Sequence, residues 1–129
     1  MERLARFLVR LTDGDYRDLS RLWLNARHLS RFKEALREAV GAQESQTRAE
    51  VVALVGKGVR AGEFTTDDEV RAALHILITV DGLGAYANDA PQEGPDYGEV
   101  AIEAAESRLG LAPGTLRARA RTAGAAAAG

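Results

Sequence analysis

One stretch that is apolar on nearly every side of a helix constrains the fold of this chain most. Between Val70 and Val80, eight of eleven residues are apolar, whereas a surface helix shows one apolar stripe and one polar face. Thr66 followed by Glu69 has the spacing of a capping box and predicts that the helix starts there. Small residues follow the stretch and would let another backbone come close: Gly82, Gly84, Ala85 and Ala87. We therefore expect this helix to be covered on two sides, by its own chain and by a partner subunit.

Composition narrows the possible classes of protein. A chain of 129 residues is one domain, large enough to bury a real core. The net charge of −2 and the pI near 5.7 give no overall attraction to nucleic acid or to anionic membranes. The absence of cysteine excludes disulfides and thiolate chemistry. No apolar run approaches the roughly 18 residues that span a bilayer, so we expect a soluble, cytoplasmic protein.

Hydrophobic spacing predicts an all-α fold with five helices, because apolar residues recur at helical intervals and no stretch alternates with period two. The expected helices cover residues 2–11, 15–28, 31–61, 66–88 and 98–109. Gly62 has the residue type that ends a helix in a left-handed conformation, and residues 89–96 are expected to form a loop. The domain is expected to comprise residues 1–111. Residues 112–129 are low in complexity, and we expect a flexible Ala/Gly/Arg tail.

The order of these features resembles a known family. Ala61-Gly62-Glu63-Phe64 ends the long helix, and Asp81-Gly82-Leu83 lies inside the apolar one. Over residues 1–111 this pattern resembles the C-terminal ligand-binding and dimerisation domain of TetR-type transcriptional regulators, most closely the group related to the choline-responsive repressors. In that family an N-terminal helix-turn-helix domain precedes this region and is missing from this sequence. We therefore expect contact with DNA only through a missing N-terminal domain or a partner.

The resemblance implies a homodimer. The helices over residues 66–88 and 98–109 would pair with their symmetry mates as a four-helix interface, which requires one self-complementary patch. The implied interface residues are Leu77, Gly82, Gly84, Ala101, Ala104 and Ala105. The alternative is that these small residues pack within one subunit.

The resemblance also implies a pocket for a small hydrophobic or amphipathic ligand among the first four helices. The candidate lining residues are Trp23, Asn25, His28, Phe32, Leu54, His75, Ile78, Thr79 and Tyr86. Each aromatic residue has an alternative role in the core, and His75 has one as a hydrogen-bonded buried histidine. Asp81 is read as a structural acceptor that requires a partner, because a buried unpaired charge is costly.

Other groups of residues give no sign of an enzyme, a cofactor or a metal site. Glu99, Glu103 and Glu106 share one side of a predicted helix without an accompanying Glu-x-x-His pattern, so we read them as a solvated acidic face. Arg117, Arg119 and Arg121 are read as a solvated basic tail. The sequence therefore favours a ligand-sensing, dimerising regulatory domain. A second hypothesis is an interaction protein that forms mixed dimers with a full-length regulator and removes one DNA-binding head from it.

Overall fold

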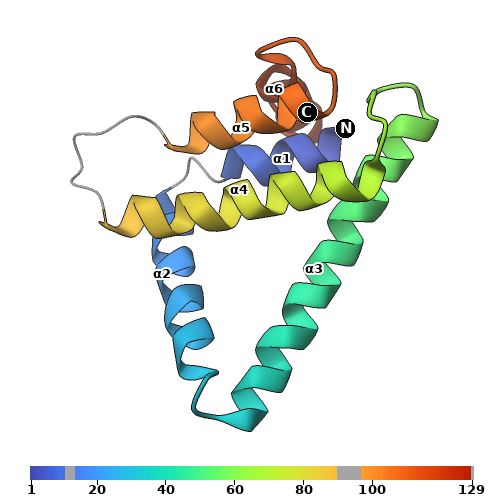
Figure 1. Ribbon diagram of the computed structural model, residues 1–129. Coiled ribbons are helices and arrows are strands. Elements are labelled where there is room, and N and C mark those ends of the chain that lie inside the picture. The colour runs from blue at the N-terminus through green and yellow to red at the C-terminus, as the bar shows by residue number, and fades with distance from the viewer. Residues whose placement is uncertain (11–13, 90–96, 129) are drawn as a thin grey trace.

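The described part of the chain is built of helices (Figure 1). The computed structural model describes residues 1–10, 14–89 and 97–128, without the side chains of 14–20, 84–89 and 97. These ranges contain no strand and six helices: α1 (Glu2–Arg10), α2 (Gly14–Leu29), α3 (Glu34–Arg60), α4 (Glu69–Asp89), α5 (Tyr97–Arg108) and α6 (Thr115–Ala128). The prediction of an all-α fold is confirmed, and the expected number of five helices is wrong.

Helix α4 packs against three of the other helices, α5, α3 and α2. In Figure 1, α2, α3 and α4 form the sides of a triangle whose lower corner is the turn between α2 and α3. Helices α1, α5 and α6 lie on the other side of α4. The chain therefore has a packed half above α4 and a more open half below it.

The hydrophobic core lies in the packed half. Its buried residues come from α1, the second half of α3, the turn after it, α4, α5 and the turn after it, and α6: Leu4, Ala5, Leu8, Val51, Val55, Phe64, Ala72, Ala73, Ile76, Val80, Ile102, Ala105, Leu109 and Leu116. The described side chains of α2 contribute none of them. Helix α2 is consequently held mainly by its contacts with α4 and α3.

Helix α4 starts later than the capping box at Thr66 predicted. The backbone amide of Arg71 donates to Oδ1 of Asp68 at 2.9 Å, which makes Asp68 the N-cap. Thr66 instead accepts a hydrogen bond from the amide of Asp68 at 3.3 Å through its hydroxyl. Asp68 thus takes the capping role that the sequence assigned to Thr66. The turn before α4 is held by a hydrogen bond from the Thr65 amide to the Leu109 carbonyl at 2.9 Å.

The turn between α3 and α4 depends on two glycines. Gly62 has a φ of 74°, as predicted for the residue that ends α3. Gly58 allows the ring of Phe64 to lie directly against the α3 backbone, where a Cβ atom would overlap the ring. Phe64 is thereby buried in the core at the point where the chain reverses.

The expectation of a flexible tail over residues 112–129 is wrong for residues 115–128, which form α6. Leu116 and Ala123 are buried, and Arg6 of α1 donates to the Ala123 carbonyl at 3.1 Å. Arg117 and Arg119, expected to be solvated, form ion pairs with Glu99 and Glu63 respectively. Composition alone did not reveal these partners because they lie on distant segments.

Glu106 is likewise not part of a solvated acidic face. Its side chain is only 3% exposed, and its carboxylate accepts hydrogen bonds from the backbone amides of Gly114 at 3.2 Å and Leu116 at 3.0 Å. These amides lie at the N-terminal end of α6, where the first donors have no partner within the helix. Glu106 therefore caps α6 from α5.

We predict that Glu106→Ala destabilises the chain by about 2–3 kcal/mol, because it leaves two amide donors without an acceptor. Urea unfolding measures this loss, and hydrogen exchange should show α6 opening first. Glu103→Ala is the matched control on the exposed face of α5, with an expected change below about 0.5 kcal/mol. Equal effects of the two substitutions would contradict the capping role.

Candidate ligand-binding cavity

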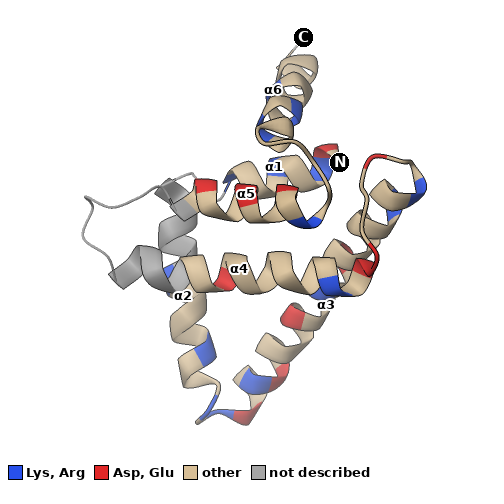
Figure 2. Cartoon of the chain, turned by 45° about the horizontal axis from the view of Figure 1, so that its top comes forward, with Lys and Arg blue, Asp and Glu red and all other residues tan. Residues whose placement is uncertain are grey.

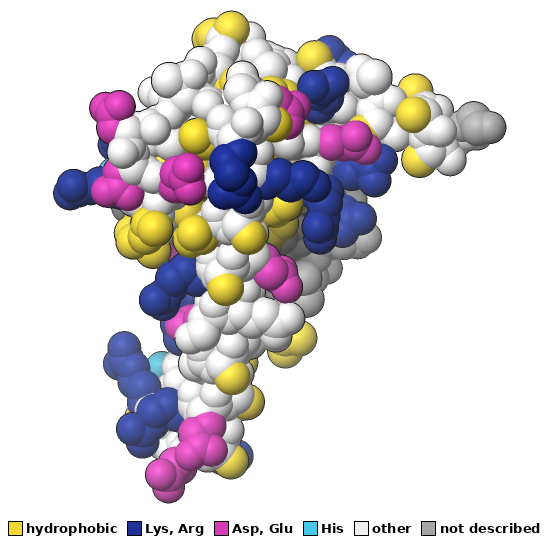
Figure 3. Space-filling view, turned by 90° about the vertical axis from the view of Figure 1, so that its right-hand side faces the viewer, with side chains coloured by type: hydrophobic (Ala, Val, Ile, Leu, Met, Phe, Trp, Pro, Cys, Tyr) yellow, Lys and Arg dark blue, Asp and Glu magenta, His cyan; other side chains and the backbone are white. Residues whose placement is uncertain are grey.

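A cavity of about 680 Å³ lies between α2, α3 and α4. Seen from the α3 side, the corner that joins α2 and α3 projects as a narrow limb from the broader body (Figure 3). All three helices line the cavity: Leu22, Trp23, Leu24, Ala26 and Arg27 from α2, Gln43, Glu44, Thr47 and Arg48 from α3, and Leu74, Leu77, Ile78 and Asp81 from α4. Leu22 is 66% exposed and Ile78 is 69% exposed, so the cavity is open to solvent.

The walls differ in polarity. The α4 wall follows helical spacing, with Leu74, Leu77, Ile78 and Asp81 at i, i+3, i+4 and i+7. The α2 wall is also largely apolar, whereas the four lining residues of α3 are all polar. Figure 2 shows the same contrast, because charged bands of both signs lie along the half of α3 near the α2–α3 turn while the described middle of α4 is nearly free of them. The cavity is therefore amphipathic.

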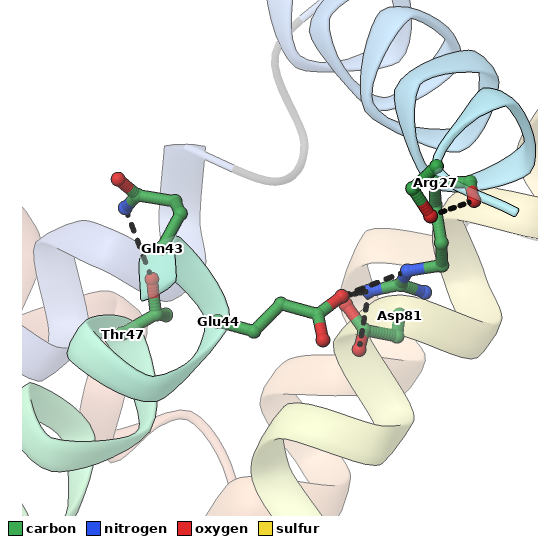
Figure 4. Close-up of polar contacts among 6 residues, drawn as sticks. Arg27, Gln43, Glu44, Thr47 and Asp81 are labelled. Atoms are coloured by element: carbon green, nitrogen blue, oxygen red, sulfur yellow. Dashed lines mark hydrogen bonds and ion pairs between the residues drawn. The ribbon is translucent and has the colours of Figure 1, made fainter. Parts of the chain in front are cut away.

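An ion-pair network that we call the Arg27 tie joins the three walls (Figure 4). The Nε and Nη2 atoms of Arg27 lie 2.9 Å and 2.6 Å from Oε1 of Glu44 on α3. Nη2 of Arg27 also lies 3.5 Å from Oδ2 of Asp81 on α4. Arg27 is thus the partner that we expected Asp81 to have. The tie connects all three helices that line the cavity.

Partial burial would lower the pKa of Arg27, but the hydrogen bond to Glu44 and the charges of Asp81 and Glu44 outweigh it and raise the pKa above its ordinary value. A raised pKa means that the contribution of Arg27 to stability is complete below the pKa of the unfolded chain and is lost only as the pH rises through the folded value. Arg27 therefore stays charged in any neutral buffer.

A second, more polar hollow of about 420 Å³ lies beside the first. It is lined by Arg27, Ser30, Arg37, Val40, Gly41, Glu44 and Asp81. Because all three residues of the Arg27 tie line both hollows, the tie forms the boundary between them.

Of the nine ligand-site residues expected from the sequence, Trp23 and Ile78 line the larger cavity. Asn25 and His28 are exposed and do not line it, because they lie on the other side of α2 from Trp23 and Arg27, at the middle of the lining face. Phe32 follows the end of α2 in the turn and is 76% exposed, with its ring edge against His28 at a centroid distance of 5.8 Å. These three residues therefore do not line this cavity.

The remaining expected ligand residues also lie outside the lining. Leu54 is about two turns beyond Thr47 on α3, toward the core. His75 and Thr79 each follow a lining residue by one position, so each is turned by about 100° away from the cavity. The hydroxyl of Thr79 donates to the His75 carbonyl at 2.7 Å. The side chain of Tyr86 is outside the described part of the chain.

The expected dimer residues divide into two groups. Ala101 and Ala105 are buried in this single chain, at 2% and 0% exposed, so they are unavailable to a partner. Leu77 lines the cavity and packs against the core. Gly82 and Ala104 remain partly exposed, and Gly84 lies outside the described side chains. The small residues of α5 thus serve mainly the contact between α4 and α5, which is the alternative considered above.

Sequence reasoning missed most residues of the polar wall and the Arg27 tie. A signal was present, because residues 43–48 are wholly polar between two apolar stretches of one helix. Such a run is ordinary on an exposed helix. Only the triangular arrangement of α2, α3 and α4 makes it face a hollow.

No family model, curated protein or solved structure matches this chain. Among the described residues, no group of three or more His, Cys, Asp or Glu side chains has the arrangement of a metal site. No described helix combines the length and the hydropathy needed to cross a membrane.

We predict that the two ion pairs of the Arg27 tie, with Glu44 and with Asp81, contribute unequally to the free energy of unfolding. Double-mutant cycles with Arg27→Gln should give a coupling energy with Glu44→Gln of about 0.5–1 kcal/mol, as for partly exposed ion pairs. The coupling with Asp81→Asn should be smaller, because that contact is longer and involves one donor. Urea unfolding of the variants measures both values, and an Asp81 coupling equal to or above that of Glu44 would contradict the geometry.

Proposed function

We propose that this chain is a small-molecule-sensing and dimerising regulatory domain, of the kind that TetR-type regulators carry. The cavity between α2, α3 and α4 is the observation that supports this function. Its volume of about 680 Å³ falls within the range of about 300–1,000 Å³ typical of ligand pockets. The lining also has the expected character, with apolar walls and a few polar groups that orient a ligand.

The position of α4 suggests how binding would reach a partner subunit. One face of α4 packs in the core through Ala72, Ile76 and Val80, and another lines the cavity through Leu74 and Ile78. A ligand that fills the cavity contacts α4 directly and favours one position of that helix over another. A ligand acts in this way only by binding one conformation more tightly. In the proposed dimer, that preference sets the spacing of any attached DNA-binding domains.

Trp23 provides a direct test of binding, because it lines the cavity and is the sole tryptophan of the chain. Titration with 1-decanol should shift its fluorescence saturably, with one molecule bound per chain. Ile78→Gln should weaken binding by about tenfold, since it replaces apolar wall with a polar group. Val70→Gln is the control on α4, because Val70 is also exposed but lies outside the lining. Absence of saturable binding would reject the sensing function.

Gly82 provides a test of dimerisation. A Cβ atom at Gly82 would meet nothing within 4 Å among the described atoms, so Gly82→Leu should leave the fold of one chain intact. We expect the wild type to be a dimer by analytical ultracentrifugation and Gly82→Leu to dissociate at least about tenfold more readily, because a bulky side chain separates closely packed helices.

Gly41→Leu is the control for this substitution, because Gly41 also has open space around it but lies on α3. The control variant should remain a dimer. A monomeric wild type, or a Gly82→Leu variant with unchanged dimer affinity, would contradict the placement of the interface on this face of α4.

A further inference from the structure

The four charges that line the larger cavity sum to zero, but they are not evenly paired. Arg27, Arg48, Glu44 and Asp81 are its four charged residues. Arg27 contacts both carboxylates, at 2.6 Å for Glu44 and 3.5 Å for Asp81. Arg48 forms no ion pair with any residue whose side chain is described. The charge left without a partner on the cavity wall is therefore positive.

The place of Arg48 matters as much as its charge. Arg48 follows Thr47 on the polar α3 wall. On the same wall, the side-chain amide of Gln43 donates to the Thr47 hydroxyl at 3.4 Å (Figure 4). The apolar walls belong to the other two helices. An elongated ligand that lies against Leu74 and Ile78 would thus have an apolar surface on two sides and hydrogen-bond donors on the third.

We infer that the cavity takes an amphiphile with one anionic headgroup, such as a carboxylate, and that Arg48 pairs with that headgroup. This inference rests on the proposed function of the cavity and adds the charge of its ligand. Guanidinium groups suit the recognition of carboxylate, phosphate and sulfate oxygens, because their N–H donors form a planar fork. The Gln43 and Thr47 side chains add neutral hydrogen-bonding groups beside it.

A cationic headgroup fits the same walls less well. It would have to share Glu44 or Asp81 with Arg27, which would weaken either the hydrogen bond of Arg27 to Glu44 at 2.9 Å or its contact with Asp81 at 3.5 Å. An anion at Arg48 leaves the Arg27 tie intact. The cavity should therefore prefer an anionic headgroup, because Glu44 and Asp81 are already paired with Arg27 whereas Arg48 is not.

The experiment compares three probes that share a ten-carbon tail: decanoate, 1-decanol and decyltrimethylammonium, each below its micellar concentration. Fluorescence of Trp23 reports binding of all three, because the residue lines the cavity. Decanoate should bind about fivefold more tightly than decanol, which is the upper end of the range for a partly exposed ion pair, and decyltrimethylammonium should bind more weakly than either. Added salt should weaken the binding of decanoate and leave that of decanol unchanged.

Arg48→Gln should remove the advantage of decanoate over decanol without changing the affinity for decanol. Arg60→Gln, which removes an exposed arginine at the far end of α3 outside both hollows, should keep that advantage. If all three probes bind equally, or if Arg48→Gln keeps the preference, the inference is wrong while the cavity remains a ligand site. If none of the probes binds, the proposed function itself fails.

Discussion

Helix α4 carries apolar side chains on more than one face, and the rest of the structure depends on how these faces are covered. The side chains of Ala72, Ala73, Ile76 and Val80 belong to the core, where α4 packs against α5 and α3. Leu74 and Ile78 point to the other side, where α2 lies across α4 without contributing to that core. Helix α4 thus contributes one face to the core and another face to the wall of the cavity. A surface helix with a single apolar stripe would have only one of these two contacts.

The open half of the triangle stays open because one of its walls is polar. If α2 and α4 closed onto α3, they would bury the side chains of Gln43, Thr47 and Arg48 against leucine and isoleucine. Each buried polar group without a partner costs about 1–3 kcal/mol, and a buried charge costs more. The Arg27 tie satisfies Glu44 and Asp81 at one boundary of the cavity and fixes the distance between the three helices there. The hollow is thus a consequence of the side chains on α3.

The sequence predicted the helices of residues 1–111 to within about three residues, because apolar spacing and Gly62 act locally. The start of α4 was missed because Asp68 and Thr66 both suit a cap. Residues 115–128 were misread because α6 depends on Glu106, Glu99 and Glu63 from distant segments. Trp23 and Ile78 line the cavity, whereas Asn25 and His28 do not, because the list of candidate residues did not take into account which face of α2 turns inward. The Arg27 tie joins residues far apart in sequence, which spacing along one helix does not reveal.

The location of the ligand is the central claim, and a crystal structure of the chain grown with 10-bromo-1-decanol tests it most directly. The anomalous signal of bromine identifies the tail of the bound alcohol without relying on the shape of weak density. We expect one bromine peak per chain between the α2 wall at Leu22 and the α4 wall at Ile78, with the alcohol oxygen near the polar α3 wall. A bromine peak only outside the triangle, or a structure in which α2 has closed onto α3 and left no hollow, would contradict the account.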